Sequence, residues 1–280
     1  MGNDVEVSVI CNAFNHGRYI RDALNGFVMQ KTDFKFEVLV HDDASTDNTA
    51  EIIREFEAKY PDIIKPIYQT ENQYSKNVWI TDVYGIRRSN GKYIALCEGD
   101  DYWTDPDKLQ KQYDALESHP GIDICVHAST LVNASDGSVS GKVEHGSEVT
   151  VIPVEKVIEG GGDFISTNSI FVRREILADR RKFVDVCPLD YTYQISGSIN
   201  GGMLYLPDNM SAYRVSVPGS WSVANNKNRR SNLNFVKELI AGLKQLDKDT
   251  DKKYHGIISK KLFRLFLSKV HLRLLIMFKR

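Results

Sequence analysis

The segment comprising residues 36–47, FEVLVHDDASTD, decides the fold class. It begins with an apolar run and changes abruptly to carboxylate and hydroxyl side chains. A short apolar run bounded by turn-forming residues predicts a strand that is buried on both faces of a sheet. The polar residues that follow favour the start of a helix, which we predict to continue to about residue 60. Strand, polar turn and helix in this order are typical of a parallel α/β sheet.

Strands and helices alternate in this way over the first 130 residues. Further strands are predicted at residues 5–11, 63–69, 93–97 and 122–128, and helices at residues 19–30, 79–88 and 106–118. The alternation predicts right-handed crossovers and a mostly parallel sheet flanked by helices. After residue 129 the pattern loosens. Strands are predicted there at residues 164–173 and 203–206, and an amphipathic helix at residues 233–246.

The composition is that of an ordinary globular protein, with 280 residues, 42% of them hydrophobic and 26% charged. The net charge of −1 hides an asymmetry, because residues 252–280 hold nine Lys and Arg and no acid. The preceding 251 residues therefore carry 27 basic and 37 acidic side chains, which argues against a nucleic-acid partner. Four cysteines without a CxxC pair predict free thiols and no zinc site. Residues 1–4 lack the features of a secretory leader, and no apolar run reaches the roughly 18 residues of a membrane span, so we expect a cytoplasmic protein.

Two acidic pairs stand where a predicted strand ends. Asp42 and Asp43 follow the strand at 36–41, and Asp100 and Asp101 follow the strand at 93–97. Parallel sheets bind ligands beyond the carboxyl ends of their strands, so we expect the two pairs to meet at one edge. Their charges would repel unless a cation lay between them, and a divalent ion on a diphosphate suits carboxylate oxygens. The alternative is that each Asp caps the helix that follows it.

Three short motifs in order carry a family resemblance. They are VSVI at 7–10 followed by NAFN at 12–15, VHDDASTD at 40–47, and GKYIA at 91–95 leading into EGDDYW at 98–103. Together they resemble the family 2 glycosyltransferases, which are inverting enzymes with the GT-A fold. The resemblance implies an α/β fold with a mostly parallel nucleotide-binding sheet. It also implies a glycosyltransferase domain over residues 1–224, with a nucleotide-sugar half at 1–130, an acceptor half at 131–224, and a C-terminal helical extension at 225–280.

The resemblance assigns roles to residues of the first half. In the family the second Asp of the early pair holds the nucleotide base, the first motif lines the base pocket, and the last Asp of the DXD region ligates Mn²⁺ or Mg²⁺. The other Asp of that region contacts the ribose or the diphosphate, and a basic residue often faces the nucleotide. The corresponding positions here are Asp43 for the base, Asn12, Ala13 and Phe14 for the pocket, Asp101 for the metal, Asp100 for the ribose or diphosphate, and Lys76 for the basic residue.

Inverting transfer also needs a general base for the acceptor hydroxyl. In the family this is an acidic residue just before a late helix, which points to Asp190, and the alternative is that Asp190 caps that helix. The family's Tyr-Arg segment is often followed two residues later by a His, where this chain departs with Ser216. Arg214 of that segment either faces the leaving diphosphate or pairs with a surface carboxylate. Thr167 and Asn168 either bind the acceptor or form a polar strand edge.

The C-terminal residues 255–280 form a predicted helix with two kinds of surface. Its apolar residues recur at helical spacing, and its basic residues lie mainly on the other side. The apolar set comprises Phe263, Phe266, Leu267, Val270, Leu274, Met277 and Phe278. Such a helix suits an anionic membrane surface, which would place the protein at the inner face of the membrane. The alternative is that the helix packs on the domain or on a second copy.

The resemblance implies an inverting transfer from a nucleotide-diphosphate sugar, by analogy UDP-linked, to a glycan or a lipid-linked glycan in polysaccharide biosynthesis. Two alternatives stay open. A non-catalytic nucleotide-sugar binder is favoured by Ser216, and a sugar-phosphate nucleotidyltransferase by the partial likeness of residues 12–18, NAFNHGR, to a phosphate-binding loop.

Overall fold

The computed structural model describes residues 5–179, 181–187, 189–220, 223 and 228–277. Its centre is a ten-stranded sheet in the order β3-β2-β1-β4-β9-β6-β10-β5, with β7 beside β6 and β8 beside β10. The strands are β1 (Val5–Ala13), β2 (Lys35–Asp42), β3 (Ile64–Tyr68), β4 (Tyr93–Leu96), β5 (Tyr102–Trp103), β6 (Ile124–Asn133), β7 (Val139–Val143), β8 (Thr150–Ile152), β9 (Phe171–Arg173) and β10 (Met203–Val215).

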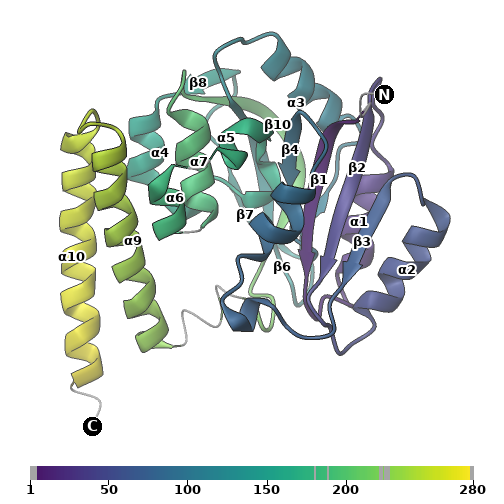
Figure 1. Cartoon of the computed structure of the whole chain (residues 1–280), viewed down its shortest axis with the longest axis horizontal. Helices are drawn as coiled ribbons and strands as arrows, with labels where there is room; N and C mark the ends of the chain where they lie inside the picture. Colours follow the sequence, from purple (N-terminus) through teal and green to yellow (C-terminus); the bar gives the residue numbers. More distant parts are fainter. Residues whose placement is uncertain (1–4, 180, 188, 221–222, 224–227, 278–280) are drawn as a thin grey trace.

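Helices cover both faces of this sheet (Figure 1). The α-helices are α1 (Ile20–Val28), α2 (Thr49–Lys59), α3 (Lys108–Glu117), α4 (Val154–Gly160), α5 (Arg174–Ala178), α6 (Lys182–Val186), α7 (Asp190–Ser198), α9 (Arg229–Asp249) and α10 (His255–Met277). The pairs β3–β2, β2–β1 and β1–β4 are parallel, as the alternation of strands and helices predicts. The pair β6–β10 is also parallel, and the short β9 runs antiparallel between β4 and β6.

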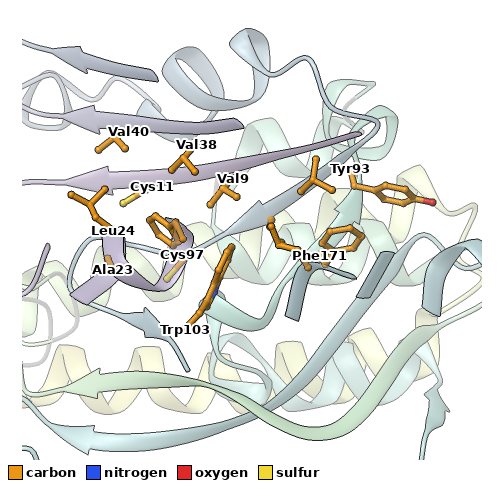
Figure 2. Close-up of a cluster of buried hydrophobic side chains, with 14 of the residues drawn as sticks. Val9, Cys11, Ala23, Leu24, Val38, Val40, Tyr93, Cys97, Trp103 and Phe171 are labelled. Atoms are coloured by element: carbon orange, nitrogen blue, oxygen red, sulfur yellow. The ribbon is translucent and has the colours of Figure 1, made fainter. Parts of the chain in front are cut away.

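The sheet is buried on both sides because its strands carry apolar residues that face two separate cores. On β1, Val9 and Cys11 face the core under α1 and α2, whereas Ile10 faces the core under α4 and α7. Figure 2 shows the first of these cores, in which Trp103 lies among side chains from β1, β2 and α1. The ring of Trp103 meets Phe27 edge-on at a centroid distance of 4.8 Å. The four cysteines are free and buried, as the sequence predicts.

Two predicted elements of the later chain differ from the structure. The prediction of a strand at 164–173 is wrong over most of that range. Residues 162–164 and 167–169 form 3₁₀ turns, and only Phe171–Arg173 pairs as β9. The side chain of Asn168 explains this, since its amide donates to Ala212 O and holds the segment in a turn. The strand expected at 203–206 continues to Val215. In the first half, the helix expected at 79–88 is a π-helical turn, Thr81–Gly85, followed by a 3₁₀ turn.

The C-terminal extension is a helical hairpin that packs on the side of the domain (Figure 1). Helix α9 contributes Leu243 and Leu246 to the core under α7, and α10 contributes Ile258. The ammonium group of Lys261 donates to Glu159 O at 2.7 Å and so ties α10 to the end of α4. Over the described residues, none of the helices combines the length and the apolar character that crossing a membrane would require.

Gly91 offers a test of how tightly β4 fits against β1. A Cβ at this position would lie 2.5 Å from Ser8 N and 2.7 Å from the carbonyl carbon of Val7. Both are backbone atoms, so the clash could be relieved only by a shift of the main chain. We expect Gly91→Ala to lower the free energy of unfolding by about 1–3 kcal/mol in a denaturant titration. Gly256→Ala is the control, because that position meets no atom within 4 Å and lies in α10, where alanine favours the helix. Equal stability of the two variants would contradict the tight fit.

Candidate active site

The carboxyl ends of β1, β2 and β4 meet at one edge of the sheet, because the three strands are adjacent and parallel. Both predicted acidic pairs lie at this edge, which confirms that the fold brings them to the same side. The N-terminus of α7 and the end of β10 complete the edge, since Arg214 contacts Asp101 and the charge of Asp190 acts on Glu98. Phe14, Asp43, Asp100 and Asp101 lie in loops that follow strands, whereas Asn12, Ala13 and Arg214 lie at the ends of strands and Asp190 begins α7.

Asp43 is almost fully buried and organises the loop at residues 72–77. Its two carboxylate oxygens accept hydrogen bonds from Gln73 N at 2.7 Å and from Tyr74 N at 3.0 Å. Its own backbone N–H donates to Ala13 O at 2.9 Å, which joins the end of β2 to the end of β1. The carboxylate does not serve as the cap of α2, where Asp47 instead accepts from Thr49 N. Asp43 therefore shapes the pocket that the sequence assigns to the base.

The first motif lies at the end of β1, beside the end of β2 that leads into Asp43. Asn12 is buried, and its amide donates to Thr81 Oγ1 at 3.0 Å and to Glu98 Oε1 at 3.3 Å. Within the described part of the chain, Asn12 Oδ1 is buried and has no hydrogen-bond partner. The ring of Phe14 is 43% exposed, although large aromatic side chains normally bury more of their surface. An exposed ring beside Asp43 offers a face on which a planar base could stack.

A group of carboxylates lies at the end of β4. Asp101 is buried, and its Oδ1 accepts from Arg214 N at 2.7 Å. Burial and the neighbouring charge of Asp100 raise the pKa of Asp101 well above its usual range. Burial, together with the charges of Asp190 and Asp100, raises the pKa of Glu98 to about 8. The raised pKa values favour the protonated forms of Glu98 and Asp101, and a bound cation would favour their ionised forms instead.

Arg214 reaches this group in an unexpected way. Its backbone N–H, rather than its guanidinium, binds Asp101. The guanidinium donates to Asp100 O at 2.7 Å, pairs with Asp22, and lies over the ring of Tyr102 at 4.4 Å. Of the two predicted alternatives, the geometry fits pairing with a carboxylate. Ser216 is exposed and has a φ of 62°, so its backbone lies in the left-handed region.

Asp190 is the first residue of α7, and Leu189 holds the cap position. Asp190 Oδ2 accepts a hydrogen bond from Thr167 Oγ1 at 2.6 Å, which fixes one side of the carboxylate. Burial raises the pKa of Asp190, and the hydrogen bond from Thr167 opposes that rise. Asn168 is fully buried, and its Oδ1 accepts from Ser211 Oγ at 2.8 Å. The side chain of Asn168 thus supports the turn from inside the protein.

Lys76 lies on the loop that Asp43 holds, where its ammonium group pairs with Glu71. Both side chains are at least half exposed, so the position of Lys76 depends on a surface ion pair.

His41, which precedes the acidic pair, is a core histidine. Its ring stacks on Tyr84 at 4.5 Å, and burial lowers its pKa to about 4.

Three residues near the carboxylates were assigned no role from the sequence. Glu98 belongs to the quoted EGDD segment, so its position in that loop could have indicated it. His16 Nε2 lies 3.9 Å from Asp100 Oδ2, and His16 Nδ1 is buried without a hydrogen-bond partner among the residues described. The pKa of Tyr213 is raised by burial and by the charges of Asp101 and Asp100. Only the tertiary structure shows that Tyr213 faces the site.

The carboxylates at the end of β4 fit a hard cation by their chemistry. Across the described ranges, no group of three or more His, Cys, Asp or Glu side chains is arranged to hold a metal ion by itself. A divalent ion such as Mg²⁺ or Mn²⁺ would therefore need further ligands, such as phosphate oxygens of a substrate. Asp101, with one oxygen taken by Arg214 N, keeps its other oxygen for such a shared ion.

Comparison with known sequences gives one clear family match. Residues 8–177 match the profile of glycosyl transferase family 2. An uncharacterized protein of Mycobacterium tuberculosis is 36% identical over 224 residues, which cover 80% of this chain and 63% of that protein. The chain thus spans less than two thirds of that relative. A putative teichuronic acid biosynthesis glycosyltransferase of Bacillus subtilis, TuaG, is 30% identical over 51% of this chain and 53% of its own.

Solved structures share the fold at low sequence identity. TarS of S. aureus in complex with UDP-GlcNAc superposes with a TM-score of 0.68 at 16% identity, over 94% of this chain and 73% of that one. The mannosyltransferase PcManGT from Pyrobaculum calidifontis, in complex with GDP-Man and Mn²⁺, gives a TM-score of 0.58 at 17% identity. It covers 96% of this chain and 72% of that one.

The bonds at Asp43 predict a local effect on the loop at residues 72–77. In Asp43→Asn the amide group would face one of the two backbone N–H donors and leave it without an acceptor, at a cost of about 1–3 kcal/mol. We expect hydrogen exchange at Gln73 and Tyr74 to accelerate by roughly 5- to 100-fold. Glu71→Gln is the matched control, because it changes an exposed side chain of the same segment and removes only the pairing with Lys76. Unchanged exchange in Asp43→Asn would show that other contacts hold the loop.

Proposed function

This chain belongs to glycosyl transferase family 2 and has the GT-A fold, and we infer its function from that family. We propose that it is an inverting glycosyltransferase that moves a sugar from a nucleotide-diphosphate donor, UDP-linked by analogy, to an acceptor hydroxyl. Residues 1–224 would form the transferase, with donor binding at 1–130, acceptor binding at 131–224, and residues 225–280 as the extension. Complexes of similar folds with UDP-GlcNAc and GDP-Man support a nucleotide-sugar donor.

One observation carries the proposal. Burial, and after it the charges of Asp190 and Asp100, raises the pKa of Glu98 to about 8, so acids from the end of β4 and the start of α7 share one electrostatic environment. Burying acids together is costly, so an arrangement of this kind is seldom explained by stability alone. A donor diphosphate that arrives with a divalent cation would relieve the repulsion. The pocket next to it, with Phe14 and Asp43, would hold the base.

Asp190 is proposed as the general base. Thr167 holds one of its oxygens, so the carboxylate has a defined orientation and its other oxygen could accept the proton of the acceptor hydroxyl. The raised pKa brings Asp190 closer to neutral pH, where a base is more effective than an ordinary carboxylate. As the hydroxyl oxygen attacks the anomeric carbon, Asp190 would take its proton and the sugar–phosphate bond would break on the opposite face.

The cation would be held by Asp101 together with the diphosphate, and Asp100 would face the ribose or diphosphate. When bound, such an ion supplies Lewis-acid stabilisation of the charge on the leaving diphosphate. A Mn²⁺ complex of PcManGT supports its use in this fold. The residues of this chain would orient the carboxyl groups: Arg214 N donates a hydrogen bond to Asp101, and the Asn12 amide donates one to Glu98.

The acceptor is proposed to be a glycan or a lipid-linked glycan. The name of the Bacillus relative, a putative teichuronic acid biosynthesis glycosyltransferase, supports a role in polysaccharide assembly. Thr167 lies beside the proposed base and would meet the acceptor. Asn168 would contribute by holding the turn in place, because its amide is occupied inside the protein.

Metal dependence can be tested with Asp101→Asn, which keeps an acceptor oxygen for Arg214 N but removes the charge. We expect Mn²⁺ to raise the affinity of the unmodified chain for a nucleoside diphosphate by about 5- to 150-fold, and this gain to disappear in Asp101→Asn. In EDTA the variant should bind at least as well as the original, because one repelling charge is gone. Isothermal titration with and without Mn²⁺ measures both values. An equal metal effect in the two proteins would place the ion elsewhere.

The role of Asp190 predicts a separation of binding from chemistry. Asp190→Asn keeps the shape of the side chain but cannot take a proton, so turnover should fall at least ~100-fold. Affinity for the nucleotide sugar should change little. Release of the nucleoside diphosphate from a panel of nucleotide sugars measures turnover. Nucleotide-sugar binding without turnover in the unmodified chain would instead favour a non-catalytic binder, and near-normal turnover of the variant would mean that the base lies elsewhere.

Thr167→Val tests the role of Asp190 through a smaller change, because it removes only the hydrogen bond to that carboxylate. Its hydrogen bond favours the ionised form of Asp190, so removing it raises the pKa of that carboxyl further. The reaction needs ionised Asp190 and slows as pH falls through this pKa. The acid limb of the kcat/KM profile should therefore move to higher pH in Thr167→Val, with the rate at alkaline pH less affected. A profile that drops uniformly at all pH values would contradict the role of Thr167.

A further inference from the structure

Helix α10 has two apolar faces, and the protein covers only one of them. The prediction that the basic residues lie mainly opposite the apolar set is wrong, because the opposite face of α10 is also apolar and packs on the protein. The inner face packs on α9 and α4 through residues such as Ile258 and Leu272, which are buried. The outer face carries large apolar side chains that are 39% to 68% exposed. We call them the outer stripe: Phe263, Phe266, Leu267, Val270, Leu274 and Met277. Phe278, which the sequence adds to this set, lies outside the described residues.

The outer stripe is narrow and continuous. At 100° per residue, its six side chains fall within an arc of about 100° and extend over about 21 Å of the helix. Isolated exposed apolar residues are common, but a contiguous row of this length marks an interaction surface. The stripe lies on a hairpin that is attached to the domain, so it is presented as a ridge at the side of the molecule (Figure 1).

Basic side chains flank the outer stripe on both sides. By helical position, Lys260 and Arg264 lie along one flank and Arg273 along the other; all three are exposed, and Arg264 also lies 3.8 Å from Glu159 of α4. Helix α10 contains no Asp or Glu. Long cationic side chains beside an apolar row can reach outward while the row enters an apolar layer. This pattern matches helices that lie in the surface of anionic lipid.

We propose that the outer stripe docks α10 on an anionic lipid surface, parallel to that surface. A second copy of this chain fits the pattern less well, because a symmetric pairing of two stripes would bring their basic flanks together without an acid on either helix. An anionic membrane offers both an apolar layer for the stripe and negative headgroups for its flanks.

The orientation of α10 agrees with the proposed function. In Figure 1, β1 starts beside the N-terminus at the top and runs downward, and α10 likewise ends at the bottom. The part of α10 that carries the stripe, from Phe263 to Met277, thus points in the same direction as the carboxyl end of β1. If the acceptor is lipid-linked, docking through α10 would keep the protein at the membrane that holds the acceptor. This last step rests on the proposed function, whereas lipid docking itself does not.

The test is co-sedimentation of the full chain with vesicles of phosphatidylcholine alone and with added phosphatidylglycerol, at low and high salt. We expect binding to the anionic vesicles, and release by high salt. The double variant Phe263→Ser with Phe266→Ser should weaken binding at least ~10-fold, because both rings are more than half exposed and would enter the lipid. Lys260→Gln with Arg273→Gln should weaken it by about fivefold for each charge removed. Val139→Ser, at an exposed apolar position on β7, is the control and should bind normally.

Two further measurements keep the outcomes distinct. Nucleotide affinity of each variant should stay unchanged, since none of the substituted residues lies at the site. If a variant loses vesicle binding but binds nucleotide normally, the result tests docking and not the proposed function. If the unmodified chain docks but does not transfer sugar, the result contradicts the proposed function and not docking. Equal binding to both kinds of vesicle would overturn the anionic preference. A dimer in light scattering that the double Phe variant converts to a monomer, without vesicle binding in the unmodified chain, would assign the stripe to a second copy and overturn the proposal.

Discussion

The crowding of carboxylates at one edge of the sheet is the constraint on which the rest of the site depends. Glu98, Asp101 and Asp190 come from two distant segments, and burial and mutual repulsion raise the pKa of Glu98 and Asp101. The protein meets them with neutral donors: Arg214 N to Asp101, the Asn12 amide to Glu98 and the Thr167 hydroxyl to Asp190. Neutral donors orient these carboxyl groups without supplying a positive charge, so a cation that arrives with a diphosphate would favour their ionised forms.

A buried polar layer behind the site holds those donors in place. Trp103 Nε1 donates to Asn168 O at 3.0 Å, and Gln112 Nε2 donates to Ser169 O at 2.9 Å, so the turn that carries Thr167 is fixed from below. Lys108 completes the layer, with its ammonium group 2.6 Å from Gln112 Oε1 and 3.9 Å from the centre of the Trp103 ring. Burial lowers the pKa of Lys108 to about 7. Satisfied polar networks of this kind favour a single arrangement of a core, which a precise site requires.

The first half of the fold could be predicted well, and the second half less well, for a physical reason that particular elements show. The strands that became β1, β2 and β4 are apolar runs with turn residues at their ends, so local pattern is enough to identify them. The segment at 164–173 has apolar residues at both ends, but the side chain of Asn168 in its polar middle binds the backbone of β10 and holds the chain in a turn. A hydrogen bond to a strand more than forty residues away leaves no local signal.

The sequence by itself determined the acidic pairs at the ends of two parallel strands, since strand, turn and acid are neighbours along the chain. It also determined the family, because three motifs occur in order. Only the tertiary structure decided that Asp190 lies beside Glu98, that Arg214 reaches Asp101 through its backbone, and which face of α10 stays exposed. These depend on contacts between distant segments. For α10 the reason is plain: a helix with apolar residues on two faces has no periodicity that tells which face will be covered, and packing against α9 and α4 settles it.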